Sequence, residues 1–315
     1  MARAADRSPI PVAPGVGVLT SRLLTRIVPA AALAAAVVSC GGRQQAAGAS
    51  LVDDAGVTVE LASPPRRVVS LIPAATELVF ALGAGGRLVG RTAWCDWPPE
   101  AAAIPSLGNG IDPSVEAVLG TRPDLVLLYR SGSNRNAAER LRALGTPVLE
   151  LAFDTIEDLR RISRLLGTAL GEPAGSDSVL ARLDRELAPA TARIADTAAR
   201  PSVVLIVWDR PPMVLGRGSF LSEIVERAGA RNAFGDLAAS SAPVSIEAIA
   251  ARDPDLILVS GDGDPAFAGR AEWQVVRAAR ERRFLRVTGS EYNRPSPRLP
   301  QAVASLADSL RRRGR

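Results

Sequence analysis

One residue type on which much hydrolytic and metal-dependent catalysis depends is missing from this chain. It contains no histidine, and its two cysteines are Cys40 and Cys95. Without an imidazole, a Ser-His-Asp triad, a Cys-His pair and a histidine metal site are all excluded. There is no carboxylate pair at catalytic spacing, and the glycines of residues 83–86 follow a predicted helix, so they form no phosphate-binding loop. These absences remove a large part of the enzyme repertoire, and we expect neither an enzyme nor a resident cofactor or metal.

Aromatic residues stand where a ligand could reach them. Trp94 and Trp97 lie in a loop of sequence TAWCDWPP, which is too aromatic for a simple connector. Tyr129 follows one predicted strand, and Trp208, with Asp209 beside it, ends another. In open α/β sheets the carboxyl ends of the strands face the ligand crevice. The strand ends therefore place Tyr129 and Trp208 at the expected crevice edge of their sheets.

One unit of sequence occurs twice and organises the rest of the chain. Residues 114–128 read SVEAVLGTRPDLVLL and residues 245–259 read SIEAIAARDPDLILV, with seven of fifteen positions identical. Each copy begins with a serine that can cap a short helix, and a glutamate follows two residues later. A Pro-Asp turn then leads into an apolar run typical of a strand buried on both faces. We expect two similar α/β lobes with a cleft between them.

The other elements fit two α/β lobes with mostly parallel central sheets. Strand and helix patterns alternate along the chain, which favours parallel pairing. Helical spacing of apolar residues over 178–197, with no strand nearby, predicts one long helix that joins the lobes, and Pro189 should kink or split it. Strands are predicted at 67–72, 88–91, 148–151, 203–208 and 284–287; helices at 76–82, 136–144, 156–170, 220–228 and 300–311. The predicted boundaries are 63–170 for the first lobe, 171–199 for the bridging helix and 200–315 for the second lobe.

The N-terminal segment, residues 1–39, predicts an export signal. Arg22 and Arg26 precede an apolar run over residues 27–38 that is too short to span a bilayer but suits a signal-peptide core. The run ends at Cys40 in the sequence VVSCGG, which resembles the bacterial lipobox, where the cysteine becomes lipidated. A plain signal peptide with a chance cysteine is the alternative. Residues 40–62 are expected to be a flexible tether that ends in a small edge strand.

The basic charge of the chain does not indicate a nucleic-acid partner. All 38 basic residues are arginines. Much of the excess of positive over negative charge lies in residues 1–39 and in the tail at 311–315. The residues between carry a small net negative charge. A basic face for nucleic acid is therefore not supported.

Several motifs in order resemble one family. They are RVVSLIPAATELVFALG at 67–83, GRTAWCDWPPEA at 90–101, the two repeated units, and SPRLPQAVASL at 296–306. The chain resembles the substrate-binding proteins of ABC importers for cobalamin, ferric siderophores and haem, and most of all the cobalamin-binding members. The resemblance covers residues 66–310. It implies two α/β lobes bridged by one helix, and a lipid-anchored, extracytoplasmic monomer that delivers a metal chelate to a permease and its ATPase.

The resemblance also implies roles for single residues. Glu116 and Glu247 match the surface glutamates, one per lobe, that pair with permease arginines; the alternative is that they only favour their helix dipoles. Trp94 matches a ligand-facing loop, where an aromatic face would stack on a macrocycle. Trp97 either joins it or packs the loop onto its lobe. Ligand contacts are accordingly expected from Trp94, Trp97, Tyr129, Trp208, Tyr292 and Arg294.

Other features leave the ligand open. Arg298 is expected to pair structurally, and Cys95 to face the core, with contact to a metal chelate as the alternative. Gly110 and Ser241 stand near positions where cobalamin-binding members can carry aromatics. A ferric siderophore or haem therefore remains the alternative to a corrinoid. A chelatase-like enzyme and a ligand sensor are more distant alternatives; the absence of histidine disfavours the first, and a permease and ATPase encoded nearby would exclude the second.

Overall fold

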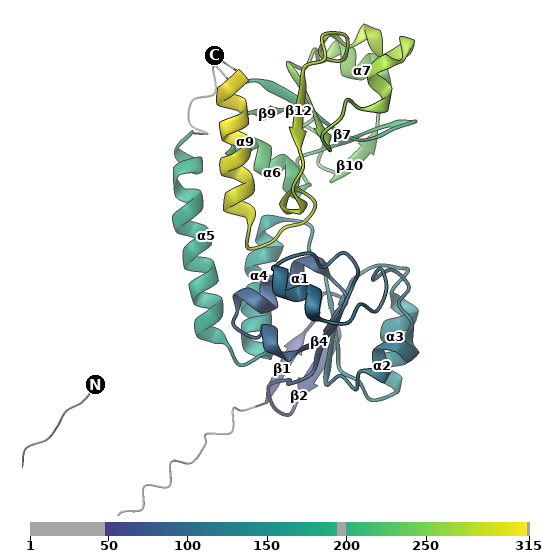
Figure 1. Cartoon of the computed structure of the whole chain (residues 1–315), viewed down its shortest axis with the longest axis vertical. Helices are drawn as coiled ribbons and strands as arrows, with labels where there is room; N and C mark the ends of the chain where they lie inside the picture. Colours follow the sequence, from purple (N-terminus) through teal and green to yellow (C-terminus); the bar gives the residue numbers. More distant parts are fainter. Residues whose placement is uncertain (1–47, 194–199, 314–315) are drawn as a thin grey trace, which may run out of the picture. The chain divides into compact units, whose positions relative to one another are not determined.

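The computed structural model describes residues 48–193 and 200–313, within a compact unit formed by residues 44–315. Two separate sheets form the centres of two lobes (Figure 1). The sheet of the first lobe is entirely parallel, in the order β4-β3-β5-β6. Its strands are β3 (Val68–Ser70), β4 (Leu88–Arg91), β5 (Leu125–Tyr129) and β6 (Val148–Leu151). Parallel pairing confirms the prediction from the alternating pattern.

Three of the four α-helices described in the first lobe begin where the sequence supplies a side-chain cap or a proline. They are α1 (Pro73–Ala81), α2 (Val115–Gly120), α3 (Arg135–Ala143) and α4 (Ile156–Ala169). Pro73 opens α1, a position where the missing N–H costs nothing. A reciprocal capping box between Thr155 and Asp158 begins α4. Short 3₁₀ helices occur at Gly85–Arg87 and Pro99–Ala103.

The second lobe contains a six-stranded mixed sheet. Strands β9, β7, β11 and β12 are parallel, whereas β8 and β10 add an antiparallel extension beyond β7. The strands are β7 (Ser202–Asp209), β8 (Pro212–Leu215), β9 (Arg231–Asn232), β10 (Ser241–Pro243), β11 (Leu256–Ser260) and β12 (Phe284–Val287). The helices are α6 (Phe220–Arg227), α7 (Ile246–Ala251), α8 (Arg277–Arg280) and α9 (Leu299–Arg313), with 3₁₀ turns at Ala266–Gly269, Ala271–Val275 and Ser290–Tyr292.

Helix α5 (Pro173–Arg193) joins the two lobes (Figure 1). It packs against α4 of the first lobe and against α6 and α9 of the second. Its buried leucines, such as Leu183 and Leu187, belong to a core that continues into both lobes. The helix begins earlier than predicted and continues through Pro189 to Arg193, so the proline does not split it.

The two repeated units fold alike, as the sequence predicts. Ser114 caps α2 by accepting a hydrogen bond from the N–H of Ala117 at 3.1 Å, and Ser245 caps α7 by accepting one from Ala248 at the same distance. The turns that follow contain left-handed residues in both lobes, at Arg122 and Asp253.

The aspartate of each repeat fixes a neighbouring strand. Asp124 Oδ1 accepts a hydrogen bond from the backbone N–H of Arg67 at 2.8 Å, just before β3. Asp255 Oδ2 accepts one from the N–H of Ser202 at 2.9 Å, at the start of β7. Each carboxylate therefore sets the register between its own strand and the strand beside it.

The segment over residues 40–62 is more ordered than the predicted tether. Its described part contains an antiparallel hairpin of β1 (Ala49–Val52) and β2 (Thr58–Leu61), of which only the second strand was expected. The predicted signal peptide and Cys40 lie outside the described residues. In the described part of the chain, no helix is both long enough and apolar enough to cross a membrane.

Two aspartates at the hairpin turn explain why this segment is held. Asp53 accepts a hydrogen bond from the N–H of Glu150 at 3.1 Å, and Asp54 accepts one from the N–H of Ala152 at 2.7 Å. Arg142 pairs with Asp53 at 2.7 Å. The carboxylates therefore satisfy backbone donors of the edge strand β6, which would otherwise offer a template for pairing with other chains.

Candidate ligand cleft

The carboxyl ends of the strands in the first lobe open onto a pocket of about 410 Å³. The neighbouring strands β3 and β5 lead in sequence to opposite sides of the sheet, and such switch points are where α/β proteins bind ligands. The pocket is lined by residues 72–74 after β3, by Tyr129 at the end of β5 and by Asp154 after β6. Ser219 and Phe220 of the second lobe and residues 293–295 complete it. The pocket therefore draws its walls from both lobes.

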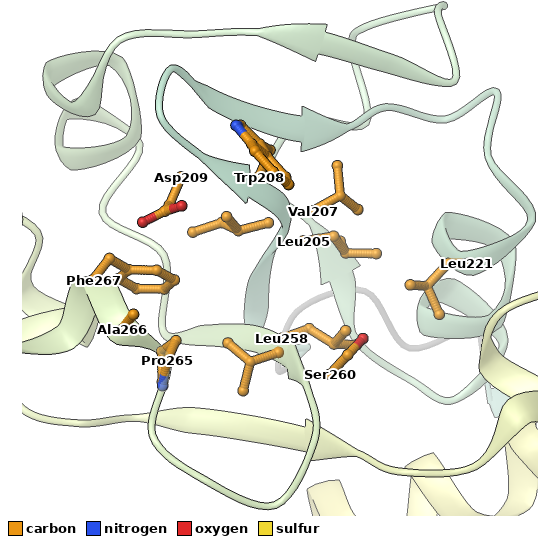
Figure 2. Close-up of a pocket in the computed structure, with 12 residues that line it drawn as sticks. Leu205, Val207, Trp208, Asp209, Leu221, Leu258, Ser260, Pro265, Ala266 and Phe267 are labelled. Carbon is orange, nitrogen blue, oxygen red and sulfur yellow. The ribbon is translucent and has the colours of Figure 1, made fainter.

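A second pocket, of about 300 Å³, lies at the carboxyl ends of β7 and β11 (Figure 2). In Figure 2, Trp208 lies on the upper side of the pocket, Phe267 on the left and Leu221 of α6 on the right. Leu221 follows directly after Phe220, which lines the first pocket. The first turn of α6 therefore separates the two pockets.

Tyr129 and Asp154 form a polar pair in the first pocket. The phenol of Tyr129 donates a hydrogen bond to Asp154 Oδ1 at 2.5 Å. Burial and this hydrogen bond raise the pKa of Tyr129 to about 12. Tyr129 therefore stays a neutral phenol across the physiological range.

Arg294 lines the same pocket but is already engaged by protein carboxylates. Its Nε donates to Glu77 Oε1 at 2.8 Å, Nη1 donates to the carbonyl of Trp94 at 3.3 Å, and Nη2 is bonded to Asp96. Arg298 donates to both oxygens of Glu77, each at 2.9 Å, which agrees with the structural pairing expected for it. The side chain of Glu77 is 1% exposed. This glutamate was not predicted from the sequence; the available signal was a lone carboxylate within the apolar helix α1.

The aromatic loop is anchored beneath its exposed tryptophans. Trp94 is 65% exposed and Trp97 is 42% exposed, and the guanidinium of Arg298 lies 4.9 Å from the centre of the Trp97 ring. Cys95 is buried between the hydroxyls of Thr76 and Thr92, at 3.1 and 3.2 Å. Cys95 therefore faces the core, which was the favoured expectation.

The remaining predicted contacts divide between surface and core. Trp208 is 63% exposed and lines the second pocket, whereas Tyr292 is buried and donates its hydroxyl hydrogen bond to the carbonyl of Ala302 at 3.0 Å. Gly110 has φ of 83°, and a Cβ there would lie 2.7 Å from the carbonyl oxygen of Leu71. An aromatic residue therefore cannot replace Gly110 in this conformation. Ser241 lies on the edge strand β10.

Glu116 and Glu247 lie at equivalent exposed positions in the first turns of α2 and α7. Hydrogen bonds from their own backbone N–H groups and from the hydroxyls of Ser114 and Ser245 lower the pKa of both carboxyl groups. Both are therefore ionised at neutral pH. Their surroundings differ, because Arg140 pairs with Glu116 at 3.2 Å, whereas no ion pair reaches Glu247 from the described residues.

The geometry defines a two-lobed binding protein, and comparison with known proteins gives its family. Residues 68–290 match the periplasmic binding protein family, and the chain belongs to it. Members of this family serve as substrate-binding components of ABC importers. The membership confirms the predicted family and two-lobed fold, an extracytoplasmic location, and a role that is not enzymatic.

Among curated proteins, the chain is 28% identical to a vitamin B12-binding protein of Pectobacterium carotovorum, covering 78% of this chain and 88% of that protein. It is 29% identical to YvrC of Bacillus subtilis, an uncharacterised ABC transporter substrate-binding lipoprotein, over 82% of this chain and 84% of that one.

Among solved structures, the haem-binding protein RhuT of Roseiflexus is 26% identical, with a TM-score of 0.69 over 78% of this chain and 97% of that chain. The vitamin B12-binding protein BtuF of Vibrio cholerae has a TM-score of 0.65 over 79% of this chain and 97% of that chain. Because BtuF of Vibrio cholerae is only 24% identical to this chain, its similarity supports the fold and not a shared ligand.

Proposed function

We propose that this protein captures cobalamin or a related corrinoid between its lobes and delivers it to the permease of an ABC importer. The observation that carries the proposal is the pocket that both lobes line, next to the anchored loop that presents Trp94. The curated relatives named as vitamin B12-binding proteins support the same ligand class. Delivery follows the role of the family in ABC importers.

The side chains around the pocket suit an amide-bearing macrocycle. The exposed face of Trp94 offers a stacking surface, and Trp208 offers a second one in the other lobe. Asp154 accepts hydrogen bonds and can take them from side-chain amides of a corrinoid as well as from Tyr129. We keep Trp94, Tyr129, Trp208 and Arg294 as proposed contacts, and assign Trp97 and Tyr292 to the support of the cleft.

Haem is the second candidate, because several similar structures are haem-binding proteins, among them RhuT and one from Pseudomonas aeruginosa at 27% identity. Protein haem iron is held by His, Cys, Met or Tyr. Among the residues that line the two pockets, Tyr129 is the one residue of these four types. Its phenol donates a hydrogen bond to Asp154, and its pKa is raised, so it does not readily lose the proton to bind iron. This geometry favours a ligand whose metal needs no axial group from the protein. A ferric siderophore meets that condition and remains the other alternative.

Uptake in cells tests the ligand and the importer role together. Deleting the gene should abolish accumulation of labelled cyanocobalamin at nanomolar supply, and a plasmid copy should restore it. A parallel assay with haemin and a ferric hydroxamate as metal sources identifies the alternatives. Normal cobalamin uptake in the deletion strain, with loss of growth on haemin, would move the assignment to haem.

Docking to the permease is proposed through Glu116 and Glu247. Their exposure, their ionised state and their equivalent places on the two lobes support this role. Ion pairs at such exposed sites set register and association rate more than affinity.

Attachment to the membrane is proposed through lipid on Cys40. The support is the lipobox-like sequence and the relative YvrC, which is named a lipoprotein. Changing Cys40 to Ser should move the protein from the membrane fraction to the soluble fraction. Mass spectrometry of the mature N-terminus should find a diacylglyceryl group on Cys40, and an unmodified N-terminus at another residue would contradict the proposal.

A further inference from the structure

Few charged side chains line the two pockets. Among the described residues that form their walls, the charged ones are Asp154 and Arg294 in the first pocket and Asp209 in the second. Arg294 is therefore the one cation in these walls that could attract an anionic ligand.

The positive charge of Arg294 is already neutralised within the protein. Its guanidinium is bound by Glu77, at 2.8 Å, and by Asp96. The adjacent Arg298 shares Glu77 and also pairs with Glu291 at 2.9 Å. Three carboxylates thus face two guanidinium groups, which leaves the cluster with a net negative charge.

No other cation in the described walls changes this balance. Asp209 is paired with Arg270, and Asp154 accepts the phenol of Tyr129 without an arginine partner in the described part of the chain. Nearby, Arg210 pairs with Glu272 at 3.6 Å, and the exposed Arg130 lines neither pocket. An anionic ligand entering the cleft would meet Asp154. It would also meet the cluster of three carboxylates around Arg294 and Arg298, whose net charge is negative. Because a cleft with low-dielectric walls focuses the field of the charges in it, this repulsion should lower the affinity for an anionic ligand.

We propose that Asp96 and Glu77, by neutralising Arg294, make this cleft select a large ligand without free carboxylates over an anionic chelate of the same size. This inference rests on the proposed role as a binding protein for metal-chelate nutrients, and it specifies the charge class of the ligand. Asp96 is the adjustable part of the cluster, because its side chain is 53% exposed whereas that of Glu77 is 1% exposed.

A matched pair of ligands tests the charge effect without changing size or shape. Cyanocobalamin and its derivative with one propionamide side chain hydrolysed to a carboxylate should be titrated into the purified protein by calorimetry. The wild type should bind the uncharged form about fivefold more tightly than the carboxylate form, a difference that shrinks as salt is added. Asp96→Asn should bring this ratio below about twofold by tightening the binding of the carboxylate form. Equal or tighter binding of the carboxylate form by the wild type would overturn the inference.

The control variant is Asp264→Asn, which removes an exposed carboxylate that is paired with Arg282 and Arg286 and lines neither pocket. It should leave the ratio unchanged, and a ratio that falls as much as in Asp96→Asn would overturn the inference. Thermal unfolding of both variants should match the wild type.

Haemin as a second macrocycle tests the charge selection separately from the corrinoid assignment. If the protein binds haemin and not cyanocobalamin, the proposed corrinoid ligand fails, and haemin is compared with its dimethyl ester. Tighter binding of the ester would uphold the charge selection on its own, whereas tighter binding of haemin would overturn it. Failure of the folded protein to bind any of these compounds would contradict both.

Discussion

The carboxylate of Glu77 on helix α1 accepts two hydrogen bonds from Arg298, both at 2.9 Å, although 221 residues separate them along the chain. Arg298 lies just before α9, in the segment that leaves the sheet of the second lobe. The pair therefore holds this segment against the first lobe, next to the loop that carries Trp94.

We predict that Glu77→Ala will lower the free energy of unfolding by about 3 kcal/mol, because Arg294 and Arg298 lose three hydrogen bonds to a buried carboxylate and keep only the more exposed Asp96 and Glu291 as carboxylate partners. Urea unfolding followed by circular dichroism measures the change. Glu281→Ala is the matched control, since its pairs with Arg280 and Arg283 are exposed and measure 4.0 and 3.8 Å. A loss at Glu77 no larger than at Glu281 would show that the cluster does not stabilise the fold.

The four tryptophans should separate into binding and structural roles. Trp94→Ala should weaken ligand binding at least about tenfold with little effect on stability, because the side chain is 65% exposed. Trp273→Ala should instead destabilise the fold by roughly 3–5 kcal/mol, because this residue is fully buried and stacks on Phe267. Calorimetry and urea unfolding of both variants test the distinction. Unchanged affinity in Trp94→Ala would exclude it as a contact.

Tyr129 should ionise near pH 12, since burial and the hydrogen bond to Asp154 raise its pKa from the usual value of 10.0. Because the folded protein holds the neutral phenol, the stability from this pair is complete below about pH 10 and is lost as pH rises toward 12. Ultraviolet titration of the Tyr292→Phe protein isolates this residue, as the chain has two tyrosines. Adding Asp154→Asn should lower the pKa of Tyr129; an ordinary pKa in the Tyr292→Phe protein would contradict the hydrogen bond.

The docking glutamates should contribute unequally. Reversal of both charges, in Glu116→Arg with Glu247→Arg, should abolish uptake in cells while leaving ligand affinity in solution unchanged. Of the single variants, Glu247→Arg should reduce uptake more, because Arg140 already shares the charge of Glu116. Arg140→Ala should raise uptake or leave it unchanged. Normal uptake by the double variant would exclude these residues from docking.

Sequence reasoning predicted the elements whose pattern is local. Helix α2 and strand β5 could be predicted from the repeated unit, because a serine cap, a Pro-Asp turn and an apolar run lie within fifteen residues. Strand β6 was also predicted with its observed bounds, Val148–Leu151. Strands β8 and β10 were missed, because both are short and contain proline.

The candidate site was harder to predict, because burial of a charge depends on partners far away in the chain. Glu77 looks like an ordinary helix residue until Arg294 and Arg298 reach it. Tyr292 and Arg294 are two residues apart and were both expected to contact the ligand, yet one lies in the core and the other lines the pocket. The direction of each side chain depends on the turn that carries it, which the sequence pattern does not specify.

A calorimetric titration of the compact fragment 44–315 with cyanocobalamin tests the corrinoid assignment. All four tryptophans and both lobes lie in this fragment. We predict saturable one-to-one binding with a submicromolar Kd, which Trp94→Ala weakens. No binding by the folded fragment up to about 100 µM cyanocobalamin, a concentration well above any useful Kd for a capture protein, would contradict the assignment to corrinoids.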